Sequence, residues 1–443
     1  MRAYTLTAAA ALVAAFVVLT TSAGAGVAGH WTQITHQANG ARANLGLARG
    51  KDGRLHVLWA GPARAPYKGI YDTAISPGGA VAGPQAVVSG WHGVNPPAAA
   101  VAPDGSVHAV ISGEKVGGQN DPYDGLNDAA GPGSWRLGAH AFGHSSISEP
   151  SNAVLAAAFL KNGQLVTIWQ SAAKLLTQVG TDPSTAPQDI TPAGLADSPQ
   201  LAVDQATGDA VVAYHNVNSG QNSLRRIQPT LGPPQIMPQA KLDAPQIAAR
   251  AGGGVYTAYT PDAVRVLLLR FGGQPKAVPV PKGVHLLTAG LAAGPEGRLW
   301  VFYGSGDKTF VTRTSKAVGG FEPIQTLTSP KNAQYFRIEG EGSAGPLDLF
   351  VDLTVDGQMK DGTYQTHVLP ALSLAVAKTG KGVTVRVLDA GDPVAGARVS
   401  GLPGGAKATD AKGTIVIAAA RKGALSLTAS KPGYVSATAK VTV

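Results

Sequence analysis

The apolar residues of this chain recur in pairs of short runs that are joined by a glycine turn. The clearest copy has an apolar run over 286–293, a turn at 294–297 and a second run at 299–303. Turn residues between two runs of strand length predict a β-hairpin. The same pattern recurs along the chain, at the hairpin glycines Gly53, Gly105, Gly163, Gly208, Gly253, Gly297 and Gly345.

The spacing of these glycines indicates a repeat architecture. Consecutive glycines lie 44 to 58 residues apart, and one four-stranded blade of a β-propeller has about that length. A third strand follows each hairpin, and in the second repeat it is predicted over 135–142. A fourth strand closes most repeats. The pattern predicts an all-β fold with a seven-bladed β-propeller; six blades are the alternative, because the copy at Gly345 is the weakest.

The last repeat has no fourth strand, because the chain enters a different pattern after Pro370. At the other end, Trp31–Thr35 reads as a strand without a repeat of its own. Pairing this strand with the last blade would close the ring and remove open sheet edges. We therefore expect the N-terminal strand to complete the seventh blade.

The N-terminus differs from the repeats in composition. Residues 1–25 contain a basic Arg2, an apolar run over 8–19 that is too short to cross a bilayer, and small residues at 23–25. Together these features predict a signal peptide. The expected domains are thus 1–25, 26–370 and 371–443. The mature protein is expected to be secreted or associated with the cell envelope, monomeric and without a transmembrane segment. The chain has no cysteine, which excludes disulfides and thiolate metal sites.

The positive charge is concentrated at the C-terminus. Of the formal net charge of +9, the last 73 residues carry +7, from ten basic and three acidic side chains. A basic module beside a near-neutral one favours contact with an anionic partner, here an envelope polymer. The alternative is a soluble, lysine-rich surface. No nucleic-acid partner is predicted.

Two family resemblances extend this interpretation. Residues 314–324 contain Ser315, two glycines and Phe321, and they look like a worn Ser-x-Asp-x-Gly-x-Thr-Trp turn that lacks its aspartate. Residues 75–79 form a fainter copy. On these motifs the propeller resembles the sialidase-like, Asp-box (BNR-repeat) superfamily, and the likeness is to the scaffold. The resemblance implies that a sialidase-like active site would need three arginines that bind a carboxylate, a tyrosine nucleophile with a glutamate partner, and an aspartate that acts as the acid. Arg42, Tyr335, Glu149 and Asp197 or Asp243 lie on suitable loops.

The second resemblance covers 371–443. The segments 383–387, 392–399, 409–413 and 431–434 follow one another in the order of a carboxypeptidase-regulatory-like (transthyretin-like) β-sandwich. Alternating apolar and polar residues over 425–429 and 437–443 support strands with one buried face. The resemblance implies an accessory Ig-like or transthyretin-like module for binding or spacing, and it implies no catalysis.

Candidate binding residues lie on the loops between blades. In a propeller these loops share one face around the axis with the loops between second and third strands. Polar groups beside a tryptophan suit a sugar or another small polar ligand. The alternative for each residue is a structural role at a strand end. The candidates are Arg42, Asn44, Trp91, His92, Asn95, Glu149, Asp197, Asp243, His285 and Tyr335.

A long acidic loop is predicted in the second repeat, over 112–134. Its side chains include Asp121, Asp124 and Asp128. Carboxylates at this density suit Ca²⁺, which takes six to eight oxygen ligands. The spacing does not match an EF-hand, so a solvated acidic loop is the alternative. No other cofactor is expected.

The leading functional hypothesis is an exported, non-enzymatic binding protein. Its propeller would recognise a glycan or protein at the loop face, and its basic C-terminal domain would bind the envelope or act as a spacer. The alternative is a glycan-active hydrolase or lyase that uses carboxylates from the inter-blade loops. A deep polar pocket with paired carboxylates at the axis would favour the enzyme. A shallow or plugged axis would favour the binding protein.

Overall fold

The computed structural model describes residues 31–35, 45–61, 68–91, 93–114, 125–143, 155–171, 174–191, 196–238, 245–330, 334–355, 358–379, 382–418 and 423–442. The predicted signal peptide lies outside them. The described part of the chain is all-β, with one 3-10 turn, η1 (Pro295–Gly297), and no α-helix. None of it forms a helix long and apolar enough to span a membrane. The described residues fall into two compact units that divide between Pro370 and Ala371.

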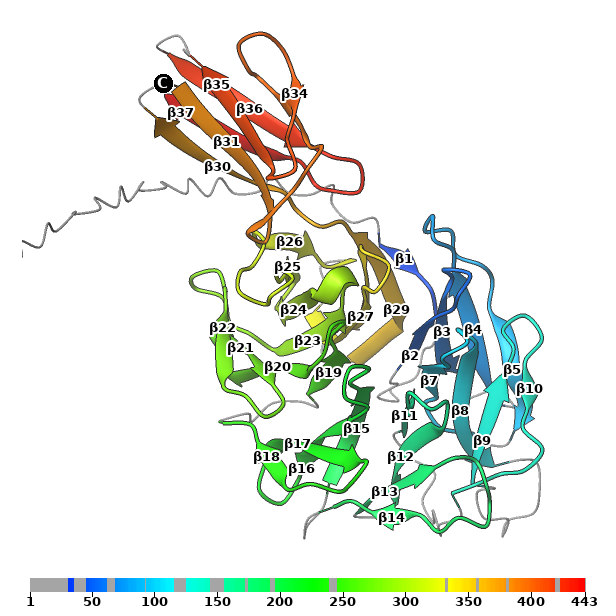
Figure 1. The fold of residues 1–443 in the computed structure, drawn as a ribbon. Coiled ribbons are helices and arrows are strands. Elements are labelled where there is room, and N and C mark those ends of the chain that lie inside the picture. The colour runs from blue at the N-terminus through cyan, green and yellow to red at the C-terminus, as the bar shows by residue number, and fades with distance from the viewer. Residues whose placement is uncertain are drawn as a thin grey trace, which may run out of the picture. The chain divides into compact units, whose positions relative to one another are not determined.

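The first unit consists of seven antiparallel sheets that follow one another along the chain (Figure 1). The first three sheets contain β2 (Gly46–Arg49), β3 (Leu55–Ala60), β4 (Lys68–Ile75) and β5 (Gln85–Trp91); β6 (Gly93–Val94), β7 (Ala98–Val101), β8 (Val107–Glu114), β9 (Leu126–Ala130) and β10 (Arg136–Leu137); and β11 (Leu155–Phe159), β12 (Leu165–Ser171), β13 (Lys174–Val179) and β14 (Gln188–Asp189).

The remaining four sheets repeat this order. They contain β15 (Ala196–Val203), β16 (Ala210–Asn216), β17 (Gln221–Gln228) and β18 (Pro234–Ile236); β19 (Gln246–Ala249), β20 (Val255–Asp262), β21 (Arg265–Arg270) and β22 (Pro275–Val278); β23 (Thr288–Ala293), β24 (Leu299–Ser305), β25 (Lys308–Arg313) and β26 (Gln325–Thr328); and β27 (Gln334–Glu341), β28 (Leu347–Val355), β29 (Gln358–Val368) and β1 (Thr32–Gln33).

The inner strands of these sheets form a closed ring. Each of β2, β7, β11, β15, β19, β23 and β27 contacts the next one, and β27 contacts β2. Sheets arranged in this way are propeller-like. The Arg49 guanidinium on β2 spans the junction between the last sheet and the first, where it pairs with Glu341 and, at 2.6 Å, with Asp348.

The N-terminal strand takes the position that the sequence predicted. β1 pairs antiparallel with β29, with Thr32 opposite Gln365 and Gln33 opposite Tyr364. The Thr363 backbone N–H also donates to the Thr35 hydroxyl, at 2.7 Å. The seventh sheet is therefore built from both ends of the unit, which joins its first and last segments by backbone hydrogen bonds.

The hairpin glycines explain why the repeat is so regular. All seven lie in the turn between the first and second strand of a sheet, and their φ angles range from 78° to 122°. Glycine adopts these angles at no steric cost, because it has no Cβ. The hydrophobic core lies between neighbouring sheets. Phe302 on β24, for example, is fully buried against Ile338 and Leu349 of the next sheet.

One predicted strand is wrong. The third strand of the second sheet is Leu126–Ala130, which pairs with β8, and the predicted stretch 135–142 contributes only the outer strand β10. The polar residues Asn127 and Asp128 made this stretch read as loop. In the structure Asn127 is buried, and Asp128 bonds to His108. The acidic loop is shorter than predicted, because strands occupy 107–114 and 126–130.

The second unit has two sheets that share one core. The first contains β30 (Ser373–Thr379), β31 (Gly382–Asp389), β32 (Asp392–Pro393) and β35 (Thr414–Ala418), and the second contains β33 (Arg398–Ser400), β34 (Lys407–Ala408), β36 (Ala424–Ser430) and β37 (Ala437–Thr442). Val385 and Ile415 of the first sheet belong to the same apolar cluster as Val399 and Leu427 of the second.

Candidate functional site

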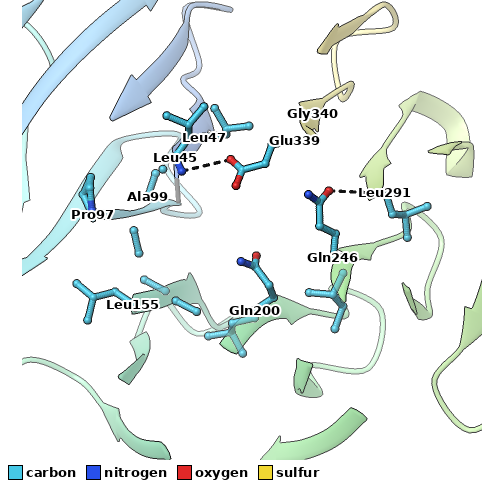
Figure 2. A pocket seen from close by; sticks show the side chains of 16 residues that line it. Leu45, Leu47, Pro97, Ala99, Leu155, Gln200, Gln246, Leu291, Glu339 and Gly340 are labelled. Atoms are coloured by element: carbon cyan, nitrogen blue, oxygen red, sulfur yellow. Dashed lines mark hydrogen bonds between the residues drawn. The ribbon is translucent and has the colours of Figure 1, made fainter. Parts of the chain in front are cut away.

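The inner strands of the ring enclose a cavity of about 200 Å³. Every one of the seven sheets contributes to its wall. Most of the lining is small or apolar, and it includes Leu45, Ala99, Leu155 and Leu291 (Figure 2). A cavity that all sheets share at their inner strands is the natural place for a rigid ring to hold a ligand.

Three polar side chains project into this cavity. They are the carboxamides of Gln200 and Gln246 and the carboxyl group of Glu339, and Figure 2 shows all three directed inward. Gln246 is held by its neighbours, because its Oε1 accepts from the Leu291 N–H at 3.3 Å and its Nε2 donates to the Ile338 carbonyl. Gln246 thereby links three consecutive inner strands.

Gln200 differs from Gln246 in that its carboxamide makes no hydrogen bond within the described residues. It follows a β-bulge, because the register between β15 and β16 shifts between Asp197 and Gln200. Ser198 within this bulge has a φ of 52°, which is unfavourable for a residue with a side chain. Strained backbone of this kind is concentrated at functional sites. The bulge places at the cavity wall a carboxamide that has no protein partner among the described residues.

Glu339 is the carboxylate among the described lining residues. Its side chain is 12% exposed. One carboxyl oxygen accepts from the Leu45 N–H at 3.2 Å, and the other lies 2.6 Å from the Arg337 Nε. Burial raises the pKa of Glu339 to about 7, against the opposing effect of Arg337. Near neutral pH this group can therefore both donate and accept a hydrogen bond.

A polar network continues from Glu339 to the N-terminal strand. Asp352 lies opposite Arg337 in the β27–β28 ladder, and burial raises the pKa of Asp352. The Thr363 hydroxyl donates to Asp352 at 2.6 Å. Thr363 also donates its N–H to Thr35, so hydrogen bonds link Asp352 to the segment that closes the ring.

The structure places few of the predicted loop residues. Arg42, Asn44, His92, Glu149 and Asp243 lie outside the described residues, as do Asp121 and Asp124 of the proposed calcium loop. The backbone of Tyr335 is in β27, opposite Leu353, and its side chain is not described. None of the described candidates lines the cavity.

The remaining candidates are at separate positions. Trp91 ends β5 and is buried among apolar side chains that include Ile111. Asn95 is also buried, and its Nδ2 donates to the Ser112 Oγ at 2.9 Å. Asp197 is half-buried opposite His215 in the β15–β16 ladder, and His285 is exposed in the segment before β23. For Trp91 and Asn95 these contacts favour a structural role.

Asp128 belongs to an arrangement that resembles a catalytic triad. Its carboxylate lies 2.9 Å from the His108 Nδ1, and the Ser106 Oγ lies 3.3 Å from the His108 Nε2. The Ser106 hydroxyl donates instead to Asp104, at 2.6 Å, so its proton is not directed to the histidine. An equivalent buried pair, His56 with Asp72, occupies the first sheet without a serine. We therefore interpret these His–Asp pairs as structural.

The two worn turns lie between the third and fourth strands of their sheets. The Ser315 Oγ accepts from the backbone N–H groups of Gly319 and Gly320, at 2.9 and 3.1 Å. In the first sheet the Ser76 Oγ accepts from the Ala80 N–H at 3.0 Å. A serine hydroxyl thus accepts backbone hydrogen bonds of the turn in both sheets, which stabilises the turn.

Sequence reasoning missed the cavity residues. Gln200, Gln246 and Glu339 lie on inner strands, whereas the search had concentrated on loops. A signal was present, because the inner strands β7 and β11 consist of small and apolar residues, such as Ala99 and Ala156. A polar side chain in the corresponding strand of another repeat is an exception to that pattern.

Comparison with known proteins gives only general likenesses. No family model and no curated protein matches the sequence. A solved structure of a protein of unknown function from Dyadobacter fermentans is 10% identical and covers 77% of this chain and 98% of its own, with a TM-score of 0.48. A fungal alcohol oxidase of the AA5 family, in complex with copper, is 13% identical over 94% of this chain and 100% of its own, with a TM-score of 0.47. The SapL1 lectin, in complex with alpha methyl fucoside, is 14% identical over 68% of this chain and 98% of its own, with a TM-score of 0.41. These likenesses concern the fold alone.

Proposed function

We propose that this chain is an exported binding protein that recognises a glycan or a protein at the axis of a seven-bladed propeller. Residues 26–370 form the propeller in this proposal, with one blade for each of the seven sheets. Residues 371–443 form a carboxypeptidase-regulatory-like β-sandwich that serves as an envelope-binding module or a spacer. The observation that carries the proposal is the shared cavity with Gln200 and Glu339 in its otherwise apolar wall.

The cavity limits the size of the bound group. Sites for drug-sized ligands usually have volumes of roughly 300–1,000 Å³, and this one has about 200 Å³. One sugar ring or one amino-acid side chain is therefore a suitable guest. The carboxamide of Gln200 and the carboxyl group of Glu339 can each pair with hydroxyl groups as donor or acceptor. Apolar walls at Leu45 and Leu291 would contact the carbon skeleton of the guest.

The test is a glycan-array and peptide-array screen of the mature protein, followed by titration calorimetry on each hit. Gln200→Leu removes the free carboxamide, and we expect about tenfold weaker binding, because one hydrogen bond contributes roughly 0.5–1.5 kcal/mol. Gln164→Leu is the matched control, since Gln164 is exposed in a hairpin turn of the third sheet. Equal affinities of the wild type and both variants would remove the cavity from the proposal.

A glycan-active hydrolase or lyase remains the second candidate, favoured by one observation. A general acid works best when its pKa is close to the operating pH, and Glu339 has a pKa of about 7. Among the described lining residues it is not paired with a second carboxylate. If the chain is an enzyme, Glu339→Gln should reduce turnover of any glycan that binds roughly 10²–10⁴-fold, while binding of that glycan persists. Absence of turnover by the wild type on that glycan leaves the binding protein as the function.

A further inference from the structure

Among the described residues, one face of the C-terminal unit carries hydroxyl groups, two cations and two alanines. In the sheet of β33, β34, β36 and β37, Val399, Leu427 and Ala439 belong to the core. Alternate residues along a strand point to opposite faces, so the residues between them face outward. The outward side chains that the structure describes are Arg398, Ser400, Ala408, Ala424, Ser426, Thr428, Ser430, Thr438 and Lys440.

The strand register makes these side chains one continuous patch, which we call the hydroxyl face. Arg398 lies opposite Ser430, and Ser400 lies opposite Thr428. On the other side of β36, Thr428 lies opposite Thr438 and Ser426 lies opposite Lys440. Two strand spacings and four residues of rise separate Arg398 from Lys440, a span of roughly 16 Å. The two cations therefore lie at opposite corners of the hydroxyl face.

The charges of the hydroxyl face are not neutralised within the described residues. Arg398 and Lys440 are exposed, and neither forms an ion pair there. The three carboxylates of the unit are elsewhere. Asp389 is buried and accepts from the Tyr434 hydroxyl, Asp392 lies opposite Asp389 in the other sheet, and Asp410 accepts backbone N–H groups within its own turn. The hydroxyl face thus has a net positive charge without a competing anion.

The opposite outer face of the unit is different in chemistry. On the sheet of β30, β31 and β35, Arg386 lies opposite Ala375 and Thr414, and Thr384 lies opposite Val416. Val416 is 64% exposed. This face mixes one cation with apolar side chains, so the combination of hydroxyl groups and two cations is particular to the hydroxyl face.

We propose that the hydroxyl face binds a linear polymer of polyol units joined by phosphodiesters. Arg398 and Lys440 would each contact a phosphate, since guanidinium groups bind phosphate oxygens bidentately and ammonium groups bind them as point charges. The serines and threonines between them would exchange hydrogen bonds with the polyol hydroxyls. A polymer of sugar rings suits the face less well, because ring faces stack on aromatic side chains and the hydroxyl face has none among its described residues.

The experiment measures binding of the full mature protein to immobilised poly(glycerol phosphate) at about 50 mM salt. The double variant R398Q/K440Q removes both cations of the hydroxyl face, and we expect about 30-fold weaker binding. The matched control R386Q/K378Q removes one arginine and one lysine from the other sheet, and we expect less than a threefold change. Thr428→Val keeps the β-branched shape but loses a central hydroxyl, which should weaken binding several-fold. Affinity should also fall as salt is raised, because ions screen exposed charges.

Two results would overturn the proposal. Equal losses in the two double variants would mean that the charge acts diffusely and not at the hydroxyl face. Equal binding of polygalacturonate, which carries carboxylates on sugar rings, would exclude selection for polyol phosphates. The proposal rests on the envelope-binding role proposed above for 371–443. It fails separately from the axial site, because R398Q/K440Q leaves Gln200 and glycan binding intact.

Discussion

Glu339 is a largely buried carboxyl group in the wall of the axial cavity. It stands on an inner strand, faces the axial cavity and pairs with Arg337. A carboxyl group in such a place resists ionisation, because the charged form loses its hydration. The pKa of Glu339 is therefore about 7 in the folded protein, well above its usual range.

This pKa makes the stability of the protein depend on pH. Between pH 4.5 and 7 the folded protein retains a proton on Glu339 that the unfolded chain releases. The free energy of unfolding should therefore fall as pH rises through this window and level off above it. Glu339→Gln should remove this contribution and leave the variant more stable than the wild type at pH 8, by on the order of 2 kcal/mol. Denaturant unfolding at pH 5, 6, 7 and 8 measures both curves; parallel curves would contradict the raised pKa.

A second residue-scale prediction concerns the buried ion pair of Arg313 and Glu322. Their side chains are 3% and 0% exposed, the Nη2–Oε1 distance is 2.9 Å, and the guanidinium lies over the Trp300 ring. Glu322→Gln should cost about 3–5 kcal/mol of unfolding free energy, because it leaves the arginine charge buried without its counter-charge. The double variant R313M/E322L should lose less than that single variant. A larger loss in the double variant, by denaturant unfolding, would argue against this account.

At the scale of elements, the closing strand depends on one glycine. Gly362 has a φ of 93°, and a Cβ at this position would overlap the Thr35 carbonyl oxygen. Gly362→Ala should therefore displace β1 from β29 and lower the melting temperature of the propeller by several degrees, as a loss of a few kcal/mol does in a large domain.

The matched control for this variant is Gly133→Ala. Gly133 has a similar φ of 90°, but a Cβ there would meet no atom within 4 Å. The control variant therefore carries the backbone strain without the collision. Equal melting temperatures for the two variants, measured by calorimetry, would show that the contact between Gly362 and Thr35 contributes nothing to closure.

The hairpins show how far elements can be predicted from sequence. Each turn glycine lies in its predicted turn. A turn that needs a positive φ favours glycine, so the glycine marks the turn in the sequence. The strand Leu126–Ala130 was missed, because its polar Asn127 and Asp128 look like loop residues. Asp128 pairs with His108, and Asn127 is buried between the strands, which the local sequence pattern does not reveal.

For the whole molecule, the separation into two units has a measurable consequence. The core of 371–443 is one apolar cluster without members from the first unit, and the units divide at Pro370. We expect two unfolding transitions in calorimetry. Gly401→Ala should lower only the transition of the C-terminal unit, since a Cβ there would overlap the Ser426 carbonyl oxygen. Gly362→Ala should lower only the other transition. A single transition that both variants shift would contradict this division.

The all-β class, the repeated hairpins and the strand that joins the last sheet could all be predicted from the amino-acid sequence. These features follow from turn glycines and from alternation of period two, which neighbouring residues encode. The sequence also located the positive charge in the last 73 residues.

Contacts between side chains that are distant in sequence became visible only in the folded structure. Gln200 and Glu339 are 139 positions apart in the sequence and face one cavity because the ring brings β15 and β27 to its axis. Arg398 and Lys440 share one face because β33 pairs with β36, which follows it only after β34 and β35, and β36 pairs with β37. Contacts of this kind depend on how strands that are far apart in the sequence pair and pack, and no local sequence pattern carries that information.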